Sequence, residues 1–311
     1  DLTHSNVNIE NESKLSELCF NSQTVFPDKL SQAAQTVLES GKKEPLSNHT
    51  GLTGKGIKAA IIDRPIPVDH IEFRDRIRYM EVIPGHENNS YIDFHGTTCA
   101  SYLCGKTCGV AKGVELFYYA IPNNTQPIET YYEWQLQALK KIVEYNRRHD
   151  DPIRVVSLSA PFQSNQMSRR NELEKELAST ECTLIDATMF MHNFSGIDHD
   201  LYTQTYGLNR WQIENYERNR CREEFVEYFN GLCFVPSARR TAATCDSVDE
   251  YVHFSKAVSE SWTIPHVAGA FAICLEKKQR LSFVEFTEIA KTCPKKSGFT
   301  ILDLDYILRS L

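Results

Sequence analysis

The sequence has no long hydrophobic run and no recognisable targeting segment. A membrane-spanning helix needs about 18 or more consecutive apolar residues, and no stretch of this 311-residue chain provides them. The first residues, DLTHSNVNIENES, lack the charged start and apolar segment of a signal peptide. We therefore expect no signal peptide and no membrane partner.

The sequence also lacks a strong excess of positive charge. Lys and Arg number 34 against 41 Asp and Glu, and the two signs alternate along the chain for a net charge of −7. This distribution predicts no nucleic-acid partner. No internal repeat or low-complexity tract is present, and 41% hydrophobic residues suffice for one large core. We expect residues 1–50 to form an N-terminal arm or extension and residues 51–311 to form a single domain.

Motifs for zinc, nucleotides and calcium are missing. The ten cysteines include no CxxC pair, and Cys104 and Cys108 have no matching histidines, so no metal site is expected. The segment GLTGKG at 51–56 lacks the spacing of a phosphate-binding loop, which rejects nucleotide binding and leaves a glycine turn. No Asp-x-Asp-x-Asp loop is found, so a structural calcium ion is possible but unsupported. Scattered cysteines indicate buried free thiols and a cytoplasmic location, with secretion after processing as the alternative.

What the sequence does contain is an alternation of predicted strands and helices. We expect strands at 57–62, 114–120, 154–159 and 183–190, and later at 231–237. We expect helices at 96–104, 131–146, 169–180, after 261 and at 283–293. This order predicts a mostly parallel central sheet with helices on both faces, a three-layer α/β fold. The polar and aromatic segment 192–230 is expected to form surface insertions.

Polar residues stand at three junctions of these predicted elements. Asp63 ends the first strand, at the edge where open α/β sheets bind ligands. His95 begins a predicted helix. Ser261 precedes Pro265, which we place in the first turn of a buried helix, where free N–H groups favour negative charge. Taken alone, each of these residues is more simply explained as a helix cap or a turn residue. Taken together, in the order Asp, His, Ser along the chain, they form a much more specific pattern.

Four sequence blocks carry a family resemblance over about residues 55–311. They read GKGIKAAIIDRPIPVDHIEF, HGTTCASYLCGKTCGVAKGVELFYYAI, RVVSLSAP and SWTIPHVAGAFA. The sequence resembles the subtilisin-like serine proteases, peptidase family S8, and we expect a divergent, bacterial member with the subtilisin-like three-layer fold. Residues 51–311 would then be the catalytic domain.

The resemblance implies a serine endopeptidase that works through an acyl-enzyme. Ser261 would be the nucleophile, His95 the general base and Asp63 the group that orients His95. Asn193 would supply the side-chain donor of the oxyanion hole. A peptide or protein substrate would pair with the segment that contains Ser157, Ser159, Ala160 and Pro161. No cofactor is required, and a role in processing a precursor or leader peptide is expected.

Several departures from the family pattern keep a second hypothesis open. Arg64-Pro65 and Ser259-Glu260 replace small residues and glycine, Thr98 replaces a histidine, and Trp262 replaces a common methionine, where its ring would wall the pocket. The alternative is a pseudoprotease that acts as a binding or regulatory module. Acids near the expected cleft suggest a preference for basic peptides, with a solvated acidic face as the simpler explanation; they are Asp69, Asp93, Asp186 and Asp198.

Overall fold

The structure is a computed structural model, and it describes residues 51–83, 92–122, 128–190, 193–197, 231–236, 240–254, 260–296 and 299–311. Its centre is a five-stranded sheet with strand order β2-β3-β1-β4-β5. The strands are β1 (Lys58–Asp63), β2 (Ile77–Val82), β3 (Glu115–Ala120), β4 (Ile153–Leu158) and β5 (Thr183–Asp186). All neighbouring pairs in this sheet are parallel.

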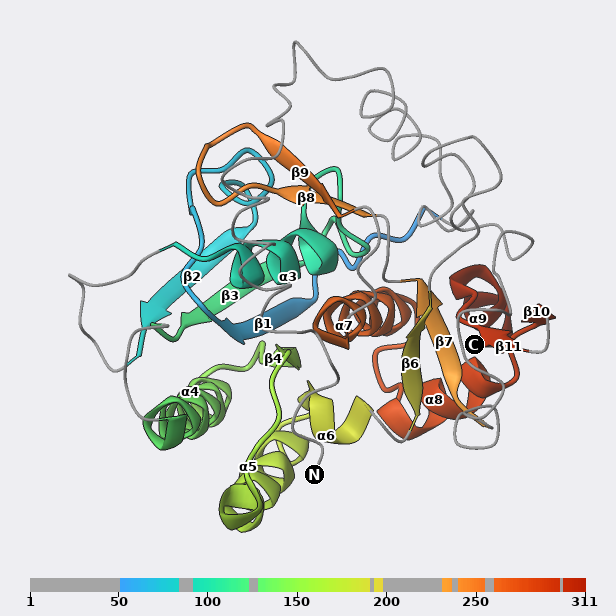
Figure 1. Cartoon of the computed structure of the whole chain (residues 1–311). Helices are drawn as coiled ribbons and strands as arrows, with labels where there is room; N and C mark the ends of the chain where they lie inside the picture. The colour runs from blue at the N-terminus through green and yellow to red at the C-terminus, as the bar shows by residue number, and fades with distance from the viewer. Residues whose placement is uncertain are drawn as a thin grey trace.

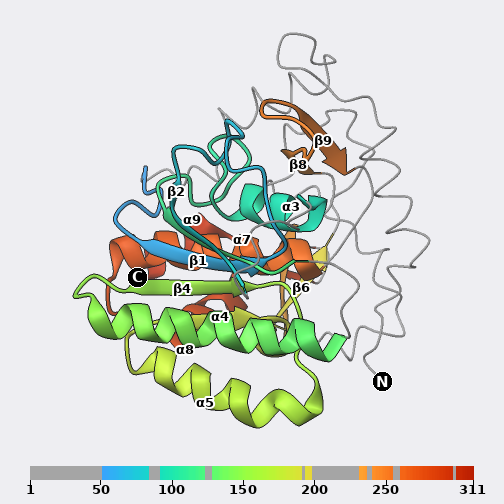
Figure 2. The same ribbon diagram turned by 90° about the vertical axis from the view of Figure 1, so that its left-hand side faces the viewer.

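Helices cover both faces of this sheet (Figures 1 and 2). On one face lie α3 (Phe94–Cys104) and α7 (Glu260–Lys277), and on the other lie α4 (Ile128–Arg148) and α5 (Met167–Ala178). Successive residues of a strand point to opposite faces, so Ala59 and Ile61 of β1 pack in the α3–α7 core, whereas Ala60 and Ile62 pack with α4 and α5. The predicted three-layer fold is confirmed.

The C-terminal part adds a second, smaller sheet with strand order β10-β11-β7-β6. Its strands are β6 (Phe194–Ile197), β7 (Cys233–Pro236), β10 (Lys295–Lys296) and β11 (Phe299–Ile301). A separate antiparallel pair, β8 (Arg240–Ala243) and β9 (Tyr251–Phe254), lies over α3. The remaining elements are the 3₁₀ turn η2 (Ser164–Gln166) and the helices α6 (Ala187–Phe190), α8 (Phe283–Lys291) and α9 (Leu304–Ser310).

Two predicted boundaries are wrong. The strand expected at 183–190 ends at Asp186, and residues 187–190 form the short helix α6. The segment 192–230 is not entirely surface insertion, because β6 pairs with β7 and Phe194 is buried. The arm at 1–50 and residues 198–230 lie outside the described residues.

The glycine turn before β1 binds the side-chain carboxylate of Glu276. The backbone N–H groups of Thr53, Gly54 and Lys55 donate to one carboxylate oxygen of Glu276, at 2.8, 2.6 and 3.1 Å. Gly54 has φ +79°, a left-handed conformation that glycine adopts without strain. The turn therefore ties the start of β1 to the end of α7.

Eight of the ten cysteines lie in the described part of the chain, and all eight are free, seven of them buried. This agrees with the predicted buried thiols. Within the described ranges, no helix has the length and hydropathy needed to cross a membrane.

Candidate active site

Asp63 and His95 form a buried, hydrogen-bonded pair at the carboxyl end of β1. Asp63 is the last residue of β1 and is 2% exposed. His95 Nδ1 lies 2.8 and 3.0 Å from the two carboxylate oxygens of Asp63. A neutral imidazole that donates from Nδ1 keeps its Nε2 lone pair as a proton acceptor. The pair therefore has the tautomer that a general base requires.

The electrostatics of this pair keep Asp63 ionised. Burial by itself raises the pKa of a carboxyl group. The positive charge of His95 when it is protonated, its hydrogen bond, and an N–H from Arg64 at 2.7 Å together outweigh burial and hold the pKa of Asp63 below its ordinary value. A charged carboxylate can then stabilise an imidazolium on His95.

The N-terminus of α3 fixes the position of His95. Asp93 caps this helix, and its Oδ1 accepts from the His95 backbone N–H at 2.7 Å. The Arg64 guanidinium lies 3.4 Å from both carboxylate oxygens of Asp93. Gly96 sits against the Arg64 carbonyl so closely that a Cβ atom would overlap it. Arg64, a departure from the family pattern, thus ties the end of β1 to the start of α3.

Ser261 is the second residue of α7, as expected for a serine at a helix N-terminus, and it is half-buried. Pro265 does not lie in the first turn, however, but inside the helix as its sixth residue. It cannot donate the N–H that the carbonyl of Ser261 would normally accept. The Ser159 hydroxyl donates to this carbonyl at 3.0 Å, and the Cys99 thiol donates at 3.4 Å.

Cys99 joins the three segments of the site. Its Sγ lies 3.9 Å from His95 Nδ1 and 3.5 Å from Ser159 Oγ, in addition to its contact with the Ser261 carbonyl. Cys99 therefore connects the backbone of Ser261 to the Asp63–His95 pair, and α3 and α7 pack against each other.

Asp63, His95 and Cys99 place three ligand-type atoms within 4.8 Å of one another. Burial raises the pKa of the Cys99 thiol well above its ordinary value, and the nearby Asp63 charge adds to this effect.

Trp262 does not line an open pocket. It is 3% exposed, and its ring lies 5.3 Å from the His95 ring and 6.1 Å from the Tyr102 ring. The expectation that it walls the substrate pocket is therefore wrong, because the indole packs inward between α3 and the β8–β9 pair. Its contact with His95 restricts the imidazole from a second side.

The predicted substrate segment runs from the interior of the sheet to its edge. Ser157 is 1% exposed and is paired with both Ile61 and Ile185, so β1 and β5 occupy both of its sides. Ser159 and Ala160 are half-buried beyond the end of β4, and Pro161 is exposed. The part of this segment left open for a substrate begins after Leu158.

Asn193 lies in the turn just before β6, half-buried, and its backbone carbonyl accepts from the Cys233 N–H at 2.9 Å. Its part in an oxyanion hole stays a prediction.

Two of the four acids expected to attract basic peptides have other partners. Asp93 caps α3, and Asp186 is fully buried against Arg170, with Arg170 Nε 2.8 Å from its carboxylate. Their charges are therefore neutralised within the fold. Asp69 is exposed, and Asp198 lies outside the described residues. The basic-peptide hypothesis loses the support of Asp93 and Asp186.

Sequence reasoning missed Cys99, Asp93 as the cap of α3, and the contact of Ser159 with Ser261. The signal for the cap was present, because Asp93 stands immediately before the predicted helix. Cys99 follows His95 by four residues, the spacing that places two side chains on one helix face. The contact between Ser159 and Ser261 joins residues 102 positions apart and has no local signal.

Comparison with known proteins agrees with this geometry. The model of the subtilase family, Peptidase_S8, matches residues 54–187, which include Asp63, His95 and Ser159. "Subtilisin-like protease 2" of Arthroderma otae is 30% identical over 165 residues, an alignment that covers 45% of this chain and 38% of the relative. "Subtilisin-like serine protease pepC" of Aspergillus niger is 38% identical over 64 residues, covering 21% of this chain and 12% of the relative. The chain thus matches less than half the length of these curated relatives.

A solved structure shares the fold. The crystal structure of a cold adapted subtilisin-like serine proteinase superposes with a TM-score of 0.53 at 17% identity, over 81% of this chain and 89% of that one. The two relatives above are fungal, so the expected bacterial origin has no support. Over residues 54–187 the chain is therefore similar to the subtilase family, and it shares its fold with a subtilisin-like serine proteinase.

Proposed function

We propose that this chain is a serine endopeptidase that hydrolyses peptide bonds of peptide or protein substrates. The observation that carries the proposal is the bond between His95 Nδ1 and the buried Asp63 carboxylate, at 2.8 Å, next to Ser261 at the start of α7. A hydrogen-bonded acid and imidazole beside a serine is the arrangement that activates a hydroxyl as a nucleophile.

The residues act in the following order. Ser261 Oγ attacks the carbonyl carbon of the peptide bond while His95 Nε2 takes its proton. His95 then gives this proton to the leaving amine, which breaks the C–N bond and leaves an acyl-enzyme. Water, activated by His95, hydrolyses the acyl-enzyme and restores Ser261. Asp63 stabilises the imidazolium throughout.

An oxyanion develops on the attacked carbonyl, and the N-terminal end of α7 supports its stabilisation. The backbone N–H of Ser261 points toward that end, where the helix dipole favours negative charge. Asn193 is proposed as the side-chain donor. Loss of such a donor typically raises the barrier by about 3–4 kcal/mol.

The substrate would extend along Ser159, Ala160 and Pro161. Pro161 has no backbone N–H, so fewer main-chain hydrogen bonds are available to the peptide here. The expected role in processing a precursor or leader peptide is retained as part of the proposal. The free thiols support a reducing, cytoplasmic compartment, with secretion after processing as the alternative.

Labelling with a biotinylated fluorophosphonate tests the proposal, because this probe reacts with activated serines. We expect stoichiometric label on Ser261 by peptide mapping, and loss of label in Ser261→Ala, His95→Ala and Asp63→Asn. The matched control is Ser310→Ala, a serine exposed at the end of α9, which should label like the parent. Folding of each variant is checked by circular dichroism.

The pseudoprotease alternative makes the opposite prediction. A folded chain that takes no label, with or without residues 1–50, would lack an activated serine and would support a binding module. Label that persists in Asp63→Asn and His95→Ala at the parent rate would show a reactive serine that does not depend on these two residues.

A further inference from the structure

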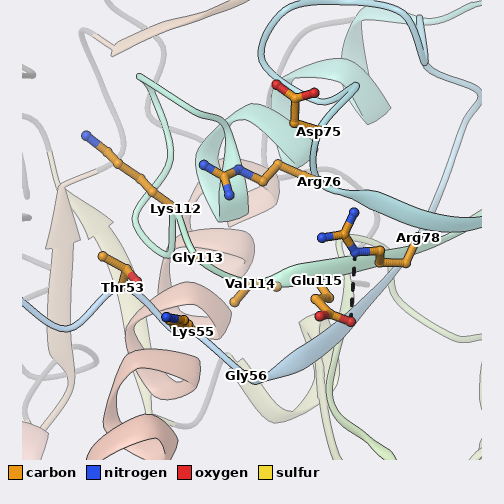
Figure 3. A pocket seen from close by; sticks show the side chains of 10 residues that line it. All are labelled: Thr53, Lys55, Gly56, Asp75, Arg76, Arg78, Lys112, Gly113, Val114 and Glu115. Atoms are coloured by element: carbon orange, nitrogen blue, oxygen red, sulfur yellow. Dashed lines mark ion pairs between the residues drawn. The ribbon is translucent and has the colours of Figure 1, made fainter.

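A pocket lies at the amino-terminal ends of the central strands, the end of the sheet opposite to Asp63. Its volume is about 530 Å³, and it opens between the turn before β1 and the starts of β2 and β3 (Figure 3). Asp63 ends β1 at the other end, and the six residues of β1 span roughly 20 Å at about 3.3 Å per residue. A molecule bound in this pocket would not touch the catalytic residues.

Positive charge dominates the pocket. Its lining contains four cationic side chains, Lys55, Arg76, Arg78 and Lys112, and two carboxylates, Asp75 and Glu115. This local excess stands out in a chain with a net charge of −7. The pair between Arg78 and Glu115 is loose, at 4.0 Å, and both side chains are exposed, so it neutralises little of the charge (Figure 3).

Arg76 gives the strongest indication of a ligand. Its residue is half-buried, and its Nε atom is buried without a hydrogen-bond partner in the described part of the chain. A buried donor on a charged group that lacks an acceptor is unfavourable. The same guanidinium lines the pocket, so an anion that enters can accept from its other N–H groups and neutralise its charge.

The neighbouring backbone amides cannot bind the same anion. The N–H groups of Thr53, Gly54 and Lys55 already donate to Glu276. Recognition in the pocket therefore depends on side chains, and above all on the planar guanidinium of Arg76, whose geometry fits phosphate oxygens.

We propose that this pocket binds a small phosphorylated molecule that carries more than one phosphate group. Its volume lies within the range of about 300–1,000 Å³ that is usual for small-molecule sites. Cations from three separate segments line the space, so phosphate groups on one ligand can pair with Arg76 and Lys55 at the same time.

Isothermal titration of the full chain with sodium tripolyphosphate tests this site. We expect saturable binding at one site, with an affinity that falls as sodium chloride increases. Arg76→Gln combined with Lys55→Gln should weaken binding at least tenfold. Arg76→Lys, which keeps the charge but loses the fork, should give an intermediate affinity.

The control is Lys175→Gln, which removes an exposed cation on α5, away from the pocket, and should leave binding unchanged. Circular dichroism and Tm confirm that the variants fold. Absence of binding above that of chloride at matched ionic strength would overturn the proposal, as would equal affinity in Arg76→Gln. Tighter binding of citrate than of tripolyphosphate would overturn the assignment to phosphate. None of these results depends on the peptidase proposal.

Discussion

The contact between Ser159 and Ser261 makes a prediction that couples two distant substitutions. Pro265 deprives the Ser261 carbonyl of its helical N–H donor, and the Ser159 hydroxyl supplies a replacement at 3.0 Å. Ser159→Ala removes this donor and leaves the weaker Cys99 thiol at 3.4 Å. A typical net hydrogen bond contributes about 0.5–1.5 kcal/mol, and an unsatisfied buried acceptor costs about 1–3 kcal/mol. Since the thiol gives partial compensation, we expect a loss of about 1–1.5 kcal/mol in the free energy of unfolding.

Pro265→Ala should change the cost of Ser159→Ala. It restores an N–H at the position from which the Ser261 carbonyl can accept, so the hydroxyl of Ser159 becomes redundant. In this background we expect Ser159→Ala to cost less than about 0.5 kcal/mol, which is a coupling energy of about 1 kcal/mol. Urea unfolding of the four chains of the cycle measures this coupling.

The rate of fluorophosphonate labelling of Ser261 provides a second reading of the same cycle. Displacement of the Ser261 backbone should slow labelling in Ser159→Ala. An increase of about 1.4 kcal/mol in the activation free energy would lower the labelling rate tenfold. Ser168→Ala, an exposed serine on α5, is the control and should change stability by less than about 0.5 kcal/mol. Equal losses from Ser159→Ala in both backgrounds would refute the role assigned to Pro265.

Three further predictions concern stability. Burial lowers the pKa of His70 below 6.5, so the unfolded chain binds a proton first as the pH falls through 6.5, and stability should decrease toward acid. His70→Gln should flatten this slope in urea titrations from pH 7 to 5, and an unchanged slope would contradict the assignment. Gly96→Ala should lower the free energy of unfolding by about 1–3 kcal/mol, because the added methyl group would overlap the Arg64 carbonyl. A variant as stable as the parent would exclude that overlap. Arg170→Met should lower the free energy of unfolding by about 3–5 kcal/mol, because it leaves Asp186 charged and buried. Adding Asp186→Leu should restore much of this stability. Additive losses from the two substitutions would argue against the buried pair.

Local sequence was enough to predict the main elements. The apolar run AAII reflects a strand that is buried on both faces. The 3.6-residue spacing of Leu136, Leu139 and Val143 reflects one buried face of a helix, and both patterns are properties of the element alone. The capping serine Ser282 accepts from the Glu285 N–H at 3.1 Å, as its spacing predicts. Short or edge strands such as β2 and β6 were missed because they have no such periodic signal.

The sequence by itself determined the alternating α/β order and the positions of Asp63, His95 and Ser261 at the ends of their elements. Parallel strands joined by right-handed crossovers then bring the carboxyl ends of the strands to one edge, so the position of Asp63 at that edge follows from topology. Only the tertiary structure decided what surrounds them. The donors for the Ser261 carbonyl, the inward packing of Trp262 and the pairing of Asp186 with Arg170 depend on contacts between segments distant in sequence. Such contacts are set by packing, and no local pattern encodes them.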